Sequence, residues 1–292
     1  MNDKIFYISS RGGSATEWLS KVLSMHPRIV AWHGTRSIPP YDSGTNDMPP
    51  EQFMKGLKIC MQQCQNMKIF GAIHGYYGLS AKEAVENENG LFSFIVRHPV
   101  TRINSLMNHY VLQIKDNPVH YSKLARKITF SKQDVYEFYE KITQNYSIEQ
   151  TGLLDFRILG SDKDINQSYT INLIRTFFDF ALTFIRLDLE CIENTNEKQM
   201  IVMEKMVASK EYFINSVWPN VAPHITTDTL YIKDIFKTEA SNRHSPGLSP
   251  WEEIFFDKWP SLFREIFYYT SRVINVEKMK NNYALAGYTL PV

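Results

Sequence analysis

The segment Lys4 to Leu19, KIFYISSRGGSATEWL, decides the fold expected for this chain. It starts with an apolar run, Ile5 to Ile8, passes through the glycine-bearing loop Ser9 to Gly13, and enters a helix-compatible stretch at Ser14. A strand, a tight loop and a helix in this order direct backbone N–H groups and a helix N-terminus toward an anion, usually phosphate. We therefore expect an anion-binding loop, although no Gly-Lys-Ser/Thr follows as in the nucleoside-triphosphate loop.

The stretch after this loop has the periodicity of an amphipathic helix. Apolar side chains recur along one helical face at Ala15, Trp18, Leu19, Val22 and Leu23. Ser14, followed three residues later by Glu17, has the form of a capping box, which predicts that the helix begins at Ser14.

Further apolar runs along the chain predict a sheet. The segments expected to form strands are 28–32, 69–73, 91–96 and 181–186. Helical patterns lie between them, among them 51–65, a helix that starts at Pro99, and 171–180. The run Leu91 to Val96 is almost continuously apolar, as in a strand buried on both faces of a parallel sheet. We predict an α/β fold of three layers, with a mainly parallel central sheet flanked by helices, a helical C-terminal half, and a single domain over residues 1–292.

Composition restricts the classes of partner. The formal net charge of +1 gives no general attraction to nucleic acid or to a membrane surface, so an anion site has to be local. No window approaches the apolar length of a membrane span, and no signal peptide is evident, so we expect a cytoplasmic protein. Cys60, Cys64 and Cys191 lack the paired ligands of a zinc site, and no metal is expected. The sequence carries no signal for an oligomeric state.

A second candidate anion site lies in the segment Phe94 to Tyr110, FIVRHPVTRINSLMNHY. Arg97 is expected at the end of a buried strand, and a helix follows from Pro99. A phosphate there could be held by the Arg97 guanidinium and by the hydroxyl of Ser105, two helical turns beyond His98. Ligands of α/β proteins bind at the carboxyl ends of strands, so two such strand ends in one sheet favour a ligand with two anionic groups. A surface ion pair of Arg97 is the alternative.

Arg97, Pro99 and Ser105 in this strand-to-helix context resemble the 3′-phosphate motif of the sulfotransferases that use 3′-phosphoadenylyl sulfate (PAPS). The stretch Gly13 to Leu19 resembles the 5′-phosphosulfate loop of the same family. Four of its residues match that loop, namely Ser14, Thr16, Trp18 and Leu19. The resemblance implies a P-loop-like sulfotransferase fold and PAPS as co-substrate.

The chain departs from the family loop at three positions. Ala15 stands where the family has glycine, Glu17 where it has threonine, and Gly13 where it has the catalytic lysine or arginine. We expect Arg11 to supply the missing cation. The residues that the resemblance implies for donor binding are Arg11, Gly12, Gly13, Ser14, Ala15, Thr16, Glu17, Trp18, Arg97, Ser105 and, from a basic loop near the C-terminus, Arg243.

The general base implied by the resemblance is His74. It follows the apolar run that ends at Ile73, and lies 23 residues before Arg97, a distance similar to that of the catalytic histidine in cytosolic members. Histidine accepts protons near neutral pH, which suits removal of a proton from an acceptor hydroxyl. His33, at the end of the second expected strand, is a rival base or a substrate contact.

The implied activity is transfer of a sulfuryl group from PAPS to a hydroxyl or amine of a soluble small-molecule or sugar acceptor. In-line displacement places the acceptor, the sulfur and the bridging oxygen on one line, with His74 as base. Three alternatives stay open: a non-catalytic PAPS- or nucleotide-binding protein, a P-loop kinase that uses Mg-ATP, and an α/β scaffold without an anion site.

Overall fold

The structure of residues 1–292 is a computed structural model. The residues that it describes are 5–10, 14–34, 49–64, 68–73, 78–103, 105, 181, 184–227, 229–238, 261–290 and 292.

The chain divides into two compact units. The first comprises residues 1–97, 188–243 and 248–251, and the second comprises 98–187, 244–247 and 252–292. The sheet and the described part of the expected 5′-phosphosulfate loop belong to the first unit, whereas Ser105 belongs to the second. The single domain expected from the sequence stays a prediction.

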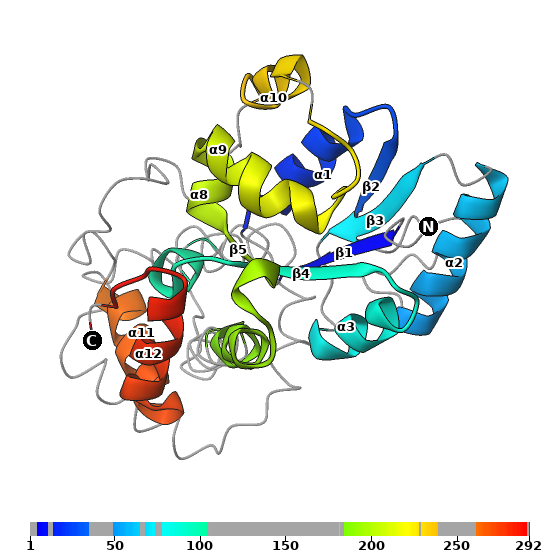
Figure 1. Ribbon diagram of the computed structural model, residues 1–292. Helices are drawn as coiled ribbons and strands as arrows, with labels where there is room; N and C mark the ends of the chain where they lie inside the picture. The colour runs from blue at the N-terminus through cyan, green and yellow to red at the C-terminus, as the bar shows by residue number, and fades with distance from the viewer. Residues whose placement is uncertain are drawn as a thin grey trace, which may run out of the picture. The chain divides into compact units, whose positions relative to one another are not determined.

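A five-stranded parallel sheet forms the centre of the first unit (Figure 1). Its strands are β1 (Ile5–Ser9), β2 (Ile29–His33), β3 (Ile69–Ile73), β4 (Leu91–Val96) and β5 (Met200–Val202). They are arranged in the order β2-β3-β1-β4-β5, and every neighbouring pair is parallel. The prediction of an α/β fold with a parallel sheet is therefore confirmed.

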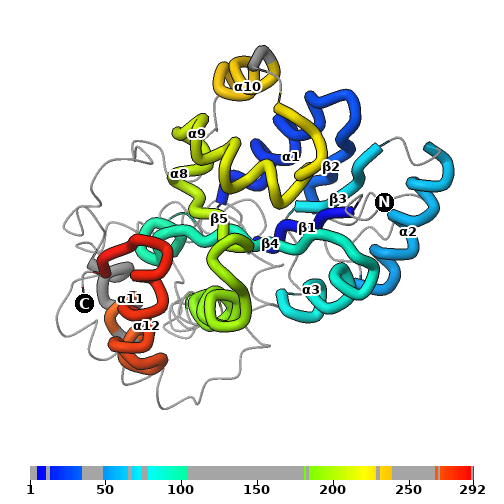
Figure 2. The backbone as a smooth tube through the Cα atoms, viewed as in Figure 1, coloured from blue at the N-terminus to red at the C-terminus, as the bar shows by residue number. Residues whose placement is uncertain are grey.

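Helices cover both faces of this sheet. Those of the first unit are α1 (Thr16–Ser24), α2 (Pro50–Gln63), α3 (Gly78–Glu86), η3 (Glu197–Gln199), α8 (Met203–Ala208), α9 (Lys210–Tyr212), η4 (Phe213–Val217), η5 (Trp218–Asn220) and α10 (Thr229–Ile235). In the views of Figures 1 and 2, α1 and the segment from α8 to η5 lie on one face, and α2 and α3 lie on the other.

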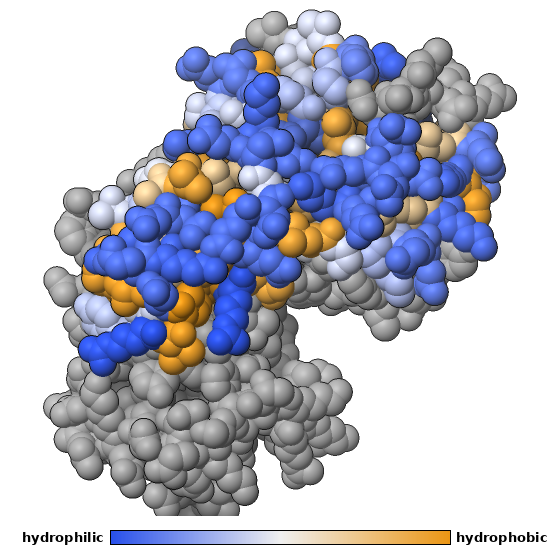
Figure 3. Space-filling model, turned by 60° about the horizontal axis from the view of Figure 1, so that its bottom comes forward, coloured by the Kyte–Doolittle hydropathy of each residue, from blue (hydrophilic) through white to orange (hydrophobic). Residues whose placement is uncertain are grey.

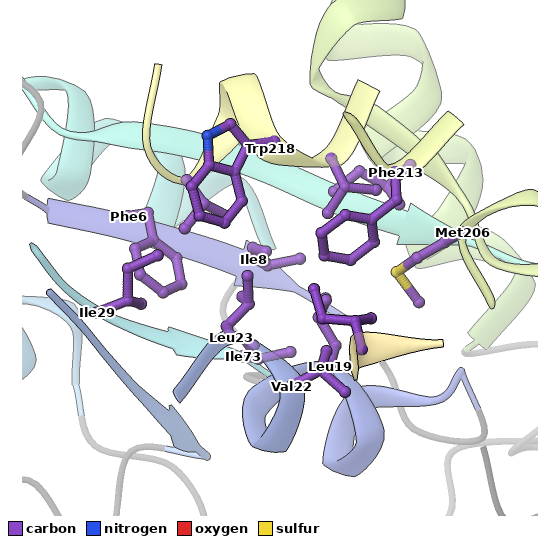
Figure 4. Packing of buried hydrophobic residues seen from close by; sticks show 14 of the residues in the cluster. Phe6, Ile8, Leu19, Val22, Leu23, Ile29, Ile73, Met206, Phe213 and Trp218 are labelled. Atoms are coloured by element: carbon purple, nitrogen blue, oxygen red, sulfur yellow. The ribbon is translucent and has the colours of Figure 1, made fainter. Parts of the chain in front are cut away.

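Alternation along β1 divides its side chains between two hydrophobic clusters. Phe6 and Ile8 pack in one cluster with Leu19, Val22 and other residues of α1, and with Trp218 of η5 (Figure 4). The intervening residues of β1 point to the other face, where the cluster contains Tyr7, Phe53, Leu57, Phe70, Val85 and Phe92. Because successive side chains of a strand point to opposite faces, a helix layer on each face buries the whole strand.

At Gly71 of β3, the neighbouring residue Phe6 of β1 leaves no space for a side chain. Gly71 pairs in register with Phe6, and the Phe6 ring lies over it. A Cβ atom at position 71 would overlap the Phe6 carbonyl oxygen and lie 2.5 Å from the Phe6 ring. Close approach of β3 to β1 therefore depends on this glycine.

We expect Gly71→Ala to lower the free energy of unfolding by about 3 kcal/mol, the upper end of the cost of overpacking. Denaturant unfolding of the purified variant measures this loss. Ala72→Gly is the control, because it changes the neighbouring residue on the opposite face and removes a methyl group, at about 1 kcal/mol. A Gly71→Ala variant as stable as the control would contradict the proposed crowding.

The second unit contains residues 184–187 of a helix that ends at residue 194, α11 (Ser261–Ile274), α12 (Val276–Leu285) and the helix that begins at Pro99, as expected. His98 caps this last helix: its Nδ1 accepts from the Val100 N–H at 3.2 Å, and its Nε2 lies 3.1 Å from the Thr289 carbonyl oxygen. A carbonyl oxygen only accepts, so Nε2 is the donor in this contact, and the two hydrogen bonds connect the start of this helix to Thr289.

One predicted strand is wrong, and one strand was missed. Residues 184–194 form a helix, so the strand expected over residues 181–186 is not present. The side chains of Phe184, Ile185, Asp188, Leu189 and Ile192 are buried, which is the spacing of one helical face. The fifth strand is instead the short β5, within a stretch expected to be mostly helical.

None of the helices among the described residues is long and apolar enough to cross a membrane. On the face shown in Figure 3, the described surface is mostly hydrophilic, with hydrophobic residues in scattered patches. The large hydrophobic side chains exposed in the described part of the chain are Met25, Val273 and Leu285.

Candidate anion-binding site

The strand order brings the two predicted anion-binding segments to neighbouring strand ends. After β1 the chain leads through α1 to β2 on one side of the sheet, and after β4 it leads eventually to β5 on the other side. The connections that leave the adjacent carboxyl ends of β1 and β4 therefore diverge. In open α/β sheets, ligands bind in the crevice that such divergence creates. The segment that starts at Ser10 and the residue Arg97 both lie at this edge.

The backbone at the start of α1 has a conformation suited to anions. Ala15 is the N-cap residue, with φ 55° and ψ 26°, in the left-handed region, and Thr16 begins the helix. A left-handed residue beside right-handed ones turns consecutive N–H groups toward one point, which forms an anion-binding nest. For a residue with a Cβ atom this conformation costs about 1–2 kcal/mol. The resemblance noted above puts glycine here, and glycine adopts the same conformation without that cost.

The expected capping box is not present. The N-cap is Ala15 rather than Ser14, and α1 has no side-chain cap hydrogen bond. The left-handed turn at Ala15 moves the helix start two residues beyond the predicted one. The first N–H groups of a helix have no acceptor within the helix, so those of α1 are suited to a ligand oxygen.

Thr16 links the start of α1 to the end of β2. Its Oγ1 lies 3.1 Å from Nε2 of His33, the last residue of β2. Thr16 is buried, whereas His33 is exposed. His33 pairs in register with Ile73, so this hydrogen bond lies beside the end of β3. A hydroxyl held by an imidazole at a helix N-terminus is fixed in position for contact with a ligand.

The remaining described loop residues have different surroundings. Ser14 is buried, and Glu17 is exposed. Trp18 is a core residue, since its Nε1 donates to the Thr238 carbonyl oxygen at 2.7 Å and its ring packs edge-on against Phe213. Any contact of Trp18 with an anion therefore has to come from its backbone N–H.

Arg97 follows β4 directly and is only 7% exposed. A buried guanidinium needs anionic or hydrogen-bonding partners, because removal of its charge from water is costly. Ser105 is also buried, in the helical segment of the second unit. The expected joint contact of Arg97 and Ser105 with one phosphate stays a prediction.

Five predicted site residues lie outside the described residues: Arg11, Gly12, Gly13, His74 and Arg243. His74 comes directly after Ile73 in the chain, and Ile73 is paired with His33. No group of three or more His, Cys, Asp or Glu side chains that could hold a metal ion occurs in the part of the chain that the structure describes.

Ser10 lies within the expected loop Ser9 to Gly13 but was not among the residues predicted to bind the donor. It is 3% exposed, and its Oγ has no hydrogen-bond partner among the described residues. It directly follows β1, at the same strand end as the loop. The sequence signal is a pair of serines, Ser9 and Ser10, at the end of an apolar strand, outside the two motifs of the resemblance.

Two of the displaced pKa values among the described residues belong to side chains at the C-terminal end of α1. Burial raises the pKa of Tyr231, whose hydroxyl donates to the Val22 carbonyl oxygen at 2.9 Å. Burial, and secondarily the charge of Arg28, lower the pKa of His26, whose ring packs edge-on against Tyr231 and Trp218. These groups hold the C-terminal part of α1 and lie at the opposite end of the helix from Thr16.

Comparison with protein-family models, curated proteins and solved structures finds no match to the chain. The fold and the described part of the site define a class: an α/β protein with a parallel sheet, in which the helix that follows β1 begins after a left-handed residue, Ala15.

Proposed function

We propose that the chain is a sulfotransferase that transfers a sulfuryl group from PAPS to a hydroxyl or amine of a soluble small-molecule or sugar acceptor. The observation that carries the proposal is the strand order. It makes β1 and β4 neighbours, and the segments that follow these two strands are the ones that resemble the two phosphate motifs of the sulfotransferases. A donor with phosphate groups at its 5′ and 3′ positions suits two anion-binding segments.

The described residues suggest how the leaving group is stabilised. The acceptor oxygen bonds to sulfur while the bond from sulfur to the bridging oxygen breaks, and that oxygen retains the electron pair. The hydroxyls of Ser14 and Thr16, with the N–H groups of the first turn of α1, would stabilise the charge on the departing 5′-phosphate. Arg11 is the proposed cation of this group.

The acceptor proton passes to a histidine. His33 already holds the Thr16 hydroxyl through Nε2, so we assign it to positioning Thr16. His74 then remains the proposed base. We expect His74→Ala to reduce turnover without weakening donor binding, and unchanged turnover would return the role of base to His33.

A non-catalytic PAPS-binding protein is the second candidate. Two features favour it: Glu17 places a carboxylate in the first turn of the helix that would bind the 5′-phosphate, and Gly13 stands at the family's cation position. A carboxylate near a bound phosphate weakens binding of the phosphate, although exposure to water reduces the effect.

Thermal unfolding with different nucleotides, followed by a transfer assay, tests the proposal. We expect 3′,5′-adenosine bisphosphate, the product of PAPS, to raise the unfolding temperature more than Mg-ATP does. Labelled sulfuryl group should then appear on at least one member of a broad panel of phenols, amines and sugars. Stabilisation by Mg-ATP alone would favour a P-loop kinase, and donor binding without any transfer would favour the second candidate.

A further inference from the structure

Ser10 and the N-terminus of α1 lie on the same face and at the same edge of the sheet. Ser93 of β4 pairs in register with Ile8, so the next residue of that face on β4 is Ile95, beside Ser10. Ile8 and Ile95 belong to the cluster that packs against Leu19 of α1. Continued alternation beyond β1 would place Ser10 on the same face as Ile8, and the chain leads from this strand end to α1.

The Ser10 hydroxyl is buried without a partner among the described residues, and Ser10 directly follows β1. A buried hydroxyl without a hydrogen bond destabilises a fold, and at the open carboxyl end of a strand a ligand can supply the missing partner. The chain leads from this strand end to α1, whose first N–H groups follow the left-handed residue Ala15 and would bind an anion.

We propose that Ser10 is an anion-binding residue, whose buried hydroxyl donates a hydrogen bond to an oxygen of a tetrahedral oxyanion, phosphate or sulfate, held at the N-terminus of α1. The inference deepens the proposed function, since it rests on the same anion site, but it does not require sulfuryl transfer. Bound phosphate satisfies the hydroxyl and adds a charge-assisted hydrogen bond to those from the helix N–H groups.

Ser93 provides a matched control within the same sheet. It is fully buried in β4, and its Oγ also lacks a hydrogen-bond partner among the described residues. Its register partner Ile8 precedes Ser10 by two residues, so Ser93 lies further from the carboxyl edge. Ser10→Ala and Ser93→Ala remove chemically identical groups, of which only the first faces the proposed ligand.

Calorimetric titration of the full chain with inorganic phosphate and with 3′,5′-adenosine bisphosphate tests the inference. We expect both alanine variants, without ligand, to unfold at or above the temperature of the wild type, because each loses an unsatisfied hydroxyl. Ser10→Ala should raise the Kd for both ligands about 10-fold, the loss of one hydrogen bond to a charged group. Ser93→Ala should leave both Kd values within about twofold of the wild type.

Three results would overturn the inference. One is an unchanged Kd in Ser10→Ala, and another is equal weakening by Ser93→Ala. The third is a wild-type chain that binds neither ligand. A separate transfer assay distinguishes this inference from the proposed function. If phosphate binding depends on Ser10 but no sulfuryl group is transferred, Ser10 is an anion-binding residue and the proposed sulfotransferase activity is wrong. If the wild type transfers the sulfuryl group but Ser10→Ala binds the donor as tightly as the wild type, the proposed activity holds and the role of Ser10 is wrong.

Discussion

Replacement of Arg97 by alanine is expected to weaken binding of 3′,5′-adenosine bisphosphate about 100-fold. Arg97 is buried at the carboxyl end of β4, next to the strand that leads into the proposed anion-binding loop. A guanidinium can donate two parallel hydrogen bonds to a phosphate, and hydrogen bonds to charged groups contribute about 1.5–3 kcal/mol each. Two such bonds at the lower end of this range contribute about 3 kcal/mol, which corresponds to a factor on the order of 100.

Two further variants make the Arg97 result specific. Arg97→Lys keeps the charge but loses the planar two-donor geometry, so we expect an intermediate loss of about 10-fold. Arg28→Ala removes an exposed arginine just before β2, at the opposite edge of the sheet, and should leave the affinity within about twofold. Kd values come from calorimetric titration, and unfolding without ligand establishes that each variant is folded. An Arg97→Ala variant that binds as tightly as Arg28→Ala would exclude Arg97 from the site.

Three strands could be located from the sequence almost to the residue. The apolar runs that became β1, β3 and β4 are bounded by polar or glycine residues, and each is buried along nearly its whole length. A short, nearly continuous apolar run is the pattern of a strand covered on both faces. The strand order could not be predicted in this way, because it depends on contacts between segments far apart in the chain.

The errors of prediction have local causes. The run 181–186 is apolar and short, and such a run fits a strand as well as a buried helix. The buried positions that continue to Ile192 reveal the helical spacing. β5 has only three residues, Met200–Val202, too few to show any period. The capping box failed because a left-handed residue at Ala15 shifts the start of α1 to Thr16.

The sequence predicts the two segments of the candidate site, but it does not predict the contacts between their side chains. Thr16 was expected from the motif, and His33 was named as a rival base, yet nothing in the spacing indicates their hydrogen bond across 17 residues. Ser10 belongs to no motif, and only its burial and its unsatisfied hydroxyl identify it. Which of these residues come together therefore depends on contacts between strand ends, and the motifs do not specify those contacts.

Thr16→Val is expected to lower kcat for sulfuryl transfer about 100-fold with little loss of stability. Valine has nearly the shape of threonine but lacks the hydroxyl, which at the start of α1 would donate to the leaving phosphate as charge develops on it. Removal of one such donor costs about 10²–10³ in kcat in other enzymes. Thr16→Ser keeps the hydroxyl and is the control, with an expected loss below about threefold in the same transfer assay.

The Thr16 variant also separates the two roles considered for His33. If His33 acts by orienting the Thr16 hydroxyl through the 3.1 Å contact, His33→Ala should reduce kcat about 10-fold alone and by less than about twofold in a Thr16→Val background. A general base acts on the acceptor instead, so its removal would cost about 10²–10⁴ in either background. If the loss of kcat in the Thr16→Val/His33→Ala double variant is the product of the two single losses, His33 is the base. If the double variant loses hardly more than Thr16→Val alone, His33 acts through Thr16 and His74 remains the proposed base. His33 is exposed, so its truncation should hardly change unfolding, and the kinetic comparison remains valid in both backgrounds.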